Sequence, residues 1–167
     1  MVYGSRTVLK IAPAAAIFAF MVGITLGLPA GYYGGRLDTG LSFLANLVLA
    51  FPVILLFFLL VTPEIQETGI TTGLAAVLFI FPVIFLVVLI RTKYFTQPEK
   101  LAIYLGITVA VGLFAYVHLT NIWTPTGIWM DANTLNIFVA AVFVNSPTIF
   151  RIVRGLTMDI KTRDYVA

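Results

Sequence analysis

The fold is decided by a stretch of twenty-one residues, Val8-Leu-Lys-Ile-Ala-Pro-Ala-Ala-Ala-Ile-Phe-Ala-Phe-Met-Val-Gly-Ile-Thr-Leu-Gly-Leu28. Lys10 is its only charged residue. Crossing a hydrocarbon core of roughly 30 Å takes about 20 apolar residues in a helix, because backbone groups in lipid must be hydrogen-bonded within the segment. The stretch therefore predicts a membrane span. It does not read as a cleaved signal peptide, because no small-residue cleavage site with a polar mature chain follows it.

Four further stretches satisfy the same length and hydropathy requirement, at residues 41–61, 73–90, 101–120 and 135–152. The whole chain is 60% hydrophobic and only 10% charged, far outside the range of soluble domains. We therefore predict an all-α fold, a polytopic transmembrane helical bundle of about five spans. Residues 1–167 would form a single transmembrane domain, with a cytoplasmic tail at 153–167.

Composition also excludes several classes of site. The chain has no cysteine, which removes disulfides, thiolate metal sites and cysteine nucleophiles. Its single histidine, His118, has no second histidine or carboxylate within one helical turn, so no metal site and no cofactor are predicted. The net charge of +3 is explained by basic residues that flank membrane spans, and no aromatic and basic groove indicates nucleic acid.

Basic residues predict the orientation of the chain in the membrane, because lysine and arginine are retained on the cytoplasmic side. Eight of the ten fall after the first, third and fifth spans, and the other two, Arg6 and Lys10, lie near the N-terminus. The eight are Arg36, Arg91, Lys93, Lys100, Arg151, Arg154, Lys161 and Arg163. We therefore expect the N-terminus outside and the C-terminus in the cytoplasm.

Proline recurs in the pattern Phe-Pro-Val-Ile, at Pro52 and again thirty residues later at Pro82. One interpretation is two helices that are each kinked or started by proline, which membrane helices tolerate. The other interpretation is a duplicated helix.

Two segments together resemble the permease subunits of ABC importers for dipeptides, oligopeptides and nickel. They are Gly27-Leu-Pro-Ala-Gly-Tyr-Tyr-Gly-Gly-Arg-Leu-Asp38 and Leu49-Ala-Phe-Pro52, preceded by the similar Tyr3-Gly-Ser-Arg6. In that family a span ends in a cytoplasmic glycine turn, and the next span carries Leu-Ala-Phe-Pro. The resemblance identifies as turn and span motif Gly31, Tyr32, Tyr33, Gly34, Gly35, Asp38, Ala50, Phe51 and Pro52.

The C-terminal residues resemble the stretch that leads into the EAA loop of the same family. They read Phe150-Arg-Ile-Val-Arg-Gly155 and Lys161-Thr-Arg-Asp-Tyr-Val-Ala167. The resemblance implies that this part couples to an ATPase subunit through a short cytoplasmic helix. The residues concerned are Arg151, Arg154, Gly155, Asp164, Tyr165, Val166 and Ala167.

The chain departs from the family pattern in three respects. An arginine and an aspartate of the family are replaced by Phe43 and Asn46, which favours placing this helix against lipid or another apolar helix. Two additional spans are inserted between residues 61 and 133. The pattern is also truncated at both ends, as expected if Met1 is internal to a longer reading frame.

Two functions remain as alternatives. The first is a permease subunit of a peptide or nickel importer in a bacterial or archaeal plasma membrane. It would contact membrane lipid, other transmembrane subunits, ATPase subunits and an external substrate-binding protein, with Asn136, Asn145 and Ser146 as candidate path-lining residues. The second is a permease-derived, non-transporting accessory or scaffold subunit of a respiratory or photosynthetic complex. An enzyme is not expected, because Asp38, Asp131, Asp159 and Asp164 are predicted to lie in loops.

Overall fold

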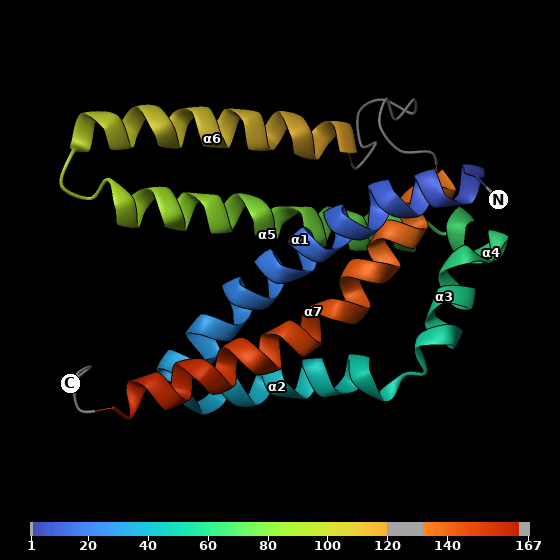
Figure 1. The fold of residues 1–167 in the computed structure, drawn as a ribbon, viewed down its shortest axis with the longest axis horizontal. Helices are drawn as coiled ribbons and strands as arrows, with labels where there is room; N and C mark the ends of the chain where they lie inside the picture. Colours follow the sequence, from blue (N-terminus) through green and yellow to red (C-terminus); the bar gives the residue numbers. More distant parts are fainter. Residues whose placement is uncertain (1, 120–131, 164–167) are drawn as a thin grey trace.

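The computed structural model describes residues 2–119 and 132–163, and every regular element within them is an α-helix (Figure 1). The prediction of an all-α fold is confirmed. The helices are α1 (Val2–Tyr33), α2 (Gly35–Ala50), α3 (Val53–Val61), α4 (Pro63–Glu67), α5 (Ile70–Lys93), α6 (Pro98–Leu119) and α7 (Ala132–Lys161). Within the described ranges four helices, α1, α5, α6 and α7, are long and apolar enough to cross a membrane. The bent pair α2 and α3 adds a fifth crossing if it acts as one span.

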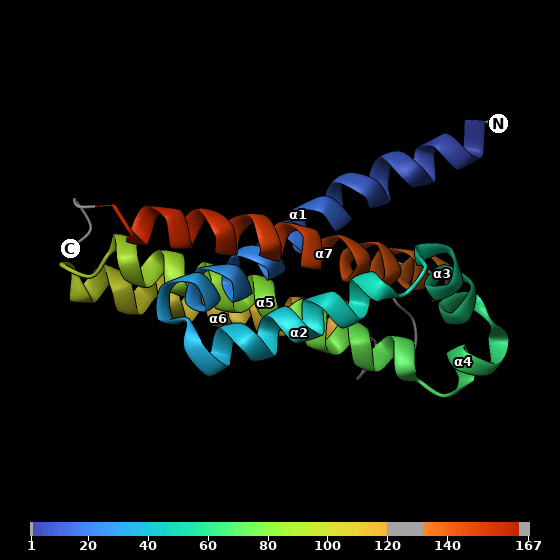
Figure 2. The same cartoon turned by 90° about the horizontal axis from the view of Figure 1, so that it is seen from below.

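The long helices alternate in direction along one axis (Figure 1). The turn between α1 and α2, the turn between α5 and α6, and the end of α7 all lie at the same end of the bundle, on the left of Figure 1. Seven of the eight basic residues that follow the first, third and fifth predicted spans belong to these three places, whereas Arg151 lies further in, ten residues before the end of α7. The opposite end carries α4 and the start of α7, and α1 projects from it away from its neighbours (Figure 2).

The closest helix packing joins α1 and α7, which run parallel. Gly23, Gly27 and Gly31 of α1 meet Ile149, Val153 and Thr157 of α7 in the same order, one helical turn apart. The missing side chains allow the two backbones to approach closely, as small residues at four-residue spacing do in membrane helices. Ala15 and Ala19 continue the same face of α1 and are buried.

A hydrophobic core lies where α1, α5 and α7 meet. Its centre is a group of three phenylalanines, Phe18, Phe79 and Phe138, with ring centroids 5.1 to 5.6 Å apart. Val139 and Val142 beside them are fully buried. Helix α6 reaches this core through the partly buried Tyr116, packs mainly on α5 and exposes most of its apolar surface.

The predicted span at 41–61 is interrupted at Phe51 and Pro52, where α2 and α3 meet at an angle of 82°. Proline disfavours helical geometry in the residue before it, and Phe51 accordingly adopts an extended conformation with φ −77° and ψ 132°. Pro52 stands immediately before α3, whereas Pro82 lies inside the uninterrupted α5. The same tetrapeptide therefore starts a helix in one place and continues one in the other.

Candidate functional site

The glycine turn predicted from the sequence reverses the chain within a single residue. Helix α1 ends at Tyr33 and α2 begins at Gly35, and the amide of Gly34 donates a hydrogen bond of 3.0 Å to the carbonyl of Ala30. Gly34 and Gly35 have φ values of 65° and 61°, in the region that side chains disfavour. These two glycines permit α2 to fold back along α7.

A carboxylate of this turn region is paired with the end of α7. The Arg154 Nε donates to Asp38 Oδ1, and Nη2 donates to Oδ2 at 2.6 Å, so the guanidinium grips the carboxylate with two hydrogen bonds. Ser42 Oγ lies 3.2 Å from the same Oδ1 and donates to it. Both charged side chains are partly buried, at 32% and 13% exposure, so the pair is screened less than a surface one.

A second contact joins the turn to α7 about two helical turns further along. Lys161 Nζ donates to the carbonyl of Tyr32 at 2.5 Å and lies 5.4 Å from the centre of the Tyr32 ring. Residues 153–161, predicted as a tail, are therefore a helical continuation of α7 fastened to the glycine turn. The prediction that the aspartates lie in loops is wrong for Asp38 and Asp159, which belong to α2 and α7.

The remaining motif residues do not gather at this place. Ala50, Phe51 and Pro52 are exposed at the far end of α2, and Gly155 is exposed on α7. Asp164, Tyr165, Val166 and Ala167 lie outside the described residues. Sequence reasoning named Asp38 and Arg154 in separate motifs and missed that they pair. The available signal was their opposite charge at two predicted span ends on the same side.

The three candidate path-lining residues divide into two groups. Asn136 and Ser146 are buried, at 4% and 7% exposure, and Ser146 Oγ donates to the carbonyl of Val142 at 2.5 Å. Asn145 is exposed, and its Nδ2 donates to the carbonyl of Ala141 at 2.7 Å. Only Asn145 therefore faces outward, where it can meet water, lipid or another protein.

Asn145 belongs to a row of exposed polar side chains on α7. Thr148 and Arg151 follow it at intervals of three residues, and each step turns about 60° around the helix, so the row winds over about 120° of its exposed side. Arg151 Nη2 donates to Asn46 Oδ1 of α2 at 2.5 Å, and Asn46 is exposed as well. We call Asn46, Asn145, Thr148 and Arg151 the outer polar strip. Of the two positions that depart from the family pattern, Phe43 is 64% exposed, whereas Asn46 still binds a basic side chain.

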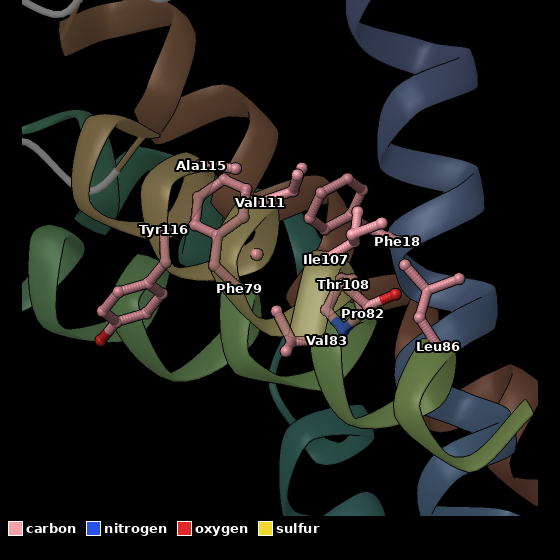
Figure 3. Close-up of a pocket in the computed structure, with 11 residues that line it drawn as sticks. Phe18, Phe79, Pro82, Val83, Leu86, Ile107, Thr108, Val111, Ala115 and Tyr116 are labelled. Carbon is pink, nitrogen blue, oxygen red and sulfur yellow. The ribbon is translucent and has the colours of Figure 1, made fainter. Parts of the chain in front are cut away.

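Two cavities open between the helices, and both are lined almost wholly by hydrophobic side chains. One, of about 310 Å³, lies between α1, α5 and α6, where Phe18, Phe79, Val83 and Tyr116 surround it (Figure 3). The other, of about 350 Å³, lies under α2 and includes Ser146. In the described ranges, no group of three or more histidine, cysteine, aspartate or glutamate side chains could hold a metal ion. The side chain of His118 is outside the described part.

Comparisons with known proteins point in two directions. The family described as "Conserved hypothetical protein 698" matches residues 2–123. A curated relative, the "Dipeptide transport system permease protein DppC" of Alkalihalophilus pseudofirmus, is 39% identical over 80 residues. That match covers 46% of this chain and 26% of the relative, so the shared part spans about a quarter of the relative's length. No solved structure matches.

Proposed function

We propose that this chain, which belongs to the family described as conserved hypothetical protein 698, is a membrane-spanning permease subunit of an ABC importer for peptides or nickel, because it is in part similar to a dipeptide permease. It would form part of the translocation path. It would carry out no chemical step itself, and ATP hydrolysis would belong to ATPase subunits. A second permease subunit and an external substrate-binding protein would complete the assembly.

The observation that carries this proposal is the pair of polar contacts between the glycine turn and the C-terminal part of α7. The motif that resembles a permease turn and the segment that resembles the approach to a coupling loop are joined by Asp38 and Arg154, and again by Tyr32 and Lys161. A displacement of the α7 end by an ATPase would therefore be passed directly to α1 and α2. This is the mechanical link that a coupled permease requires.

The outer polar strip supports the transport role separately. Polar and charged groups within membrane spans are costly in lipid and usually face protein or water. Asn145, Thr148 and Arg151 stand on the outside of the described bundle, so another subunit or an aqueous path must cover them. In the proposed assembly this face of α7 contributes a wall of the path.

Co-purification tests the proposed assembly. The native protein is extracted in mild detergent from its own membranes, and the proteins that migrate with it are identified by mass spectrometry. Recovery of ATPase subunits together with a second permease is the expected result. If electron-transfer or pigment proteins are recovered instead, the permease proposal is wrong and the chain is an accessory subunit of such a complex.

The proposed orientation places the N-terminus outside, the C-terminus in the cytoplasm, and the chain in a bacterial or archaeal plasma membrane. Since the chain has no cysteine, single substitutions report on one site each. Glu67→Cys, in the exposed α4, should react with a membrane-impermeant maleimide in intact cells, and Thr162→Cys should react only after permeabilisation. Labelling of Thr162→Cys in intact cells would show that the chain has the opposite orientation.

A further inference from the structure

Arg151 lies well inside the level of the membrane-spanning helices. Along the seam between α1 and α7, Ile149 meets Gly23 and Val153 meets Gly27, so Arg151 is level with Thr25 of α1. Helix α1 continues for eight residues beyond Thr25, which at 1.5 Å per residue places Arg151 about 12 Å from the level of its end. A guanidinium at this depth requires a polar partner.

The described chain supplies Arg151 with no negative charge. The carboxylates of α2 and α7 are engaged by other arginines, Asp38 by Arg154 and Asp159 by Arg163. The one side-chain hydrogen bond that Arg151 makes within the described ranges goes to the neutral amide of Asn46. Its positive charge is thus left for a group from outside these ranges to neutralise.

The exposed groups at this point are hydrogen-bond donors. Because Asn46 Oδ1 already accepts from Arg151, its Nδ2 remains to donate beside the guanidinium, which carries further N–H groups of its own. A cluster of donors around one positive charge selects an oxyanion. The planar guanidinium matches a carboxylate in particular, because both can form two parallel hydrogen bonds.

An acceptor lies further along the exposed side of α7. Asn145 donates through Nδ2 to its own helix, so its Oδ1 is left to accept. It precedes Arg151 by six residues, a rise of about 9 Å along the helix together with a turn of about 120° around it. An extended peptide advances about 3.3 to 3.6 Å per residue, so a chain of about three residues covers the rise and reaches toward Asn145.

We infer that Arg151 and Asn46 form a binding site for the C-terminal carboxylate of a short peptide, whose amide or ammonium end reaches toward Asn145. The inference rests on the proposed permease function and specifies where its substrate is held. It predicts that a free carboxylate is required for binding.

The test measures binding of Ala-Ala-Ala and of its C-terminal amide to the purified protein in nanodiscs by isothermal titration calorimetry. The free acid should bind, and the amide should bind at least about tenfold more weakly, the loss expected for a hydrogen bond to a charged group. Arg151→Gln should weaken binding of the acid by a similar factor. Asn46→Asp should do the same while keeping a partner for Arg151, so its effect does not depend on disruption of the fold.

The matched control is Arg36→Gln, which removes one positive charge from an exposed side chain at the same end of the bundle and should change the affinity by less than about twofold. Absence of saturable binding, or equal binding of acid and amide, would overturn the inference. So would binding of an anionic lipid in place of the peptide, seen as retention of phosphatidylglycerol by the parent protein and its loss from Arg151→Gln. If an ATPase co-purifies but Arg151→Gln leaves the affinity for the peptide unchanged, this site is excluded and the permease proposal still holds. Absence of the ATPase would remove the permease proposal itself.

Discussion

Replacement of Gly31 by alanine should loosen the contact between α1 and α7. A Cβ atom built at Gly31 would lie 2.6 Å from Thr157 Cβ and 2.8 Å from the carbonyl oxygen of Arg154. The second neighbour is backbone and cannot turn aside as a side chain does. Helices α1 and α7 must therefore move apart, close to the ion pair between Arg154 and Asp38.

The expected size of the effect follows from these distances. Ordinary contact begins near 3.4 Å, so the seam must open by about 0.8 Å at Thr157. Forcing an extra carbon into a packed interface costs about 1 to 3 kcal/mol. The higher helix propensity of alanine relative to glycine offsets up to about 1 kcal/mol of this cost. Because the Arg154 carbonyl cannot rotate away, the cost should lie in the upper part of that range, so the net loss should be about 1 to 2 kcal/mol, a fall in melting temperature of about 2 to 8 °C for a chain of this size.

The assay is thermal unfolding of the detergent-solubilised protein, followed by the fraction that remains monodisperse in size-exclusion chromatography after heating. The matched control is Gly40→Ala, since Gly40 also lies in a helix but a Cβ there would meet nothing within 4 Å. The control should be unchanged or slightly stabilised. The reasoning fails if Gly31→Ala melts at or above the temperature of the parent protein, or if Gly40→Ala falls equally.

Three further experiments probe the turn, the ion pair and the core. Gly34→Ala should cost about 1 to 3 kcal/mol through backbone strain alone, because Gly34 has a φ of 65° while its side-chain space is empty; a melting temperature equal to that of Gly40→Ala would contradict this. Asp38→Asn combined with Arg154→Gln in a double-mutant cycle should give a coupling energy of about 1 to 2 kcal/mol, and additive losses would mean that the pair does not act together. Phe138→Ala should cost about 3 to 5 kcal/mol because that ring is 1% exposed. Phe58→Ala, with a ring that is 70% exposed, should stay within about 0.5 kcal/mol, and equal losses for the two phenylalanines would remove the core assigned to α1, α5 and α7.

The helix count shows where sequence reasoning is strong and where it stops. Long apolar runs predict membrane helices because each must satisfy its own backbone hydrogen bonds in lipid, a constraint that acts on the segment alone. The same reasoning joined residues 41–61 into one span, although the structure bends them by 82° at Pro52 and leaves Pro82 inside a helix. Hydropathy is identical for both tetrapeptides, so only neighbouring packing could distinguish them.

The candidate site shows the same division. The glycine turn was predicted from its residues, because positive φ at Gly34 and Gly35 is a local property of the backbone. Which basic side chain would meet Asp38 was not predictable, since Arg151 and Arg154 differ by less than one helical turn and only the register of α7 against α2 assigns them. The burial of Ser146 and the exposure of its neighbour Asn145 likewise follow from which face of α7 meets α1.

By itself, the sequence determined that this protein is a bundle of apolar helices with a glycine reversal between the first two, because length, hydropathy and backbone freedom belong to each segment separately. The tertiary structure alone decided that α1 and α7 lie parallel in close contact, that Arg154 neutralises Asp38, and that Arg151 remains on the outer face without a carboxylate in the described part of the chain. Those outcomes depend on the relative rotation and register of helices more than one hundred residues apart in the sequence, which no local pattern encodes.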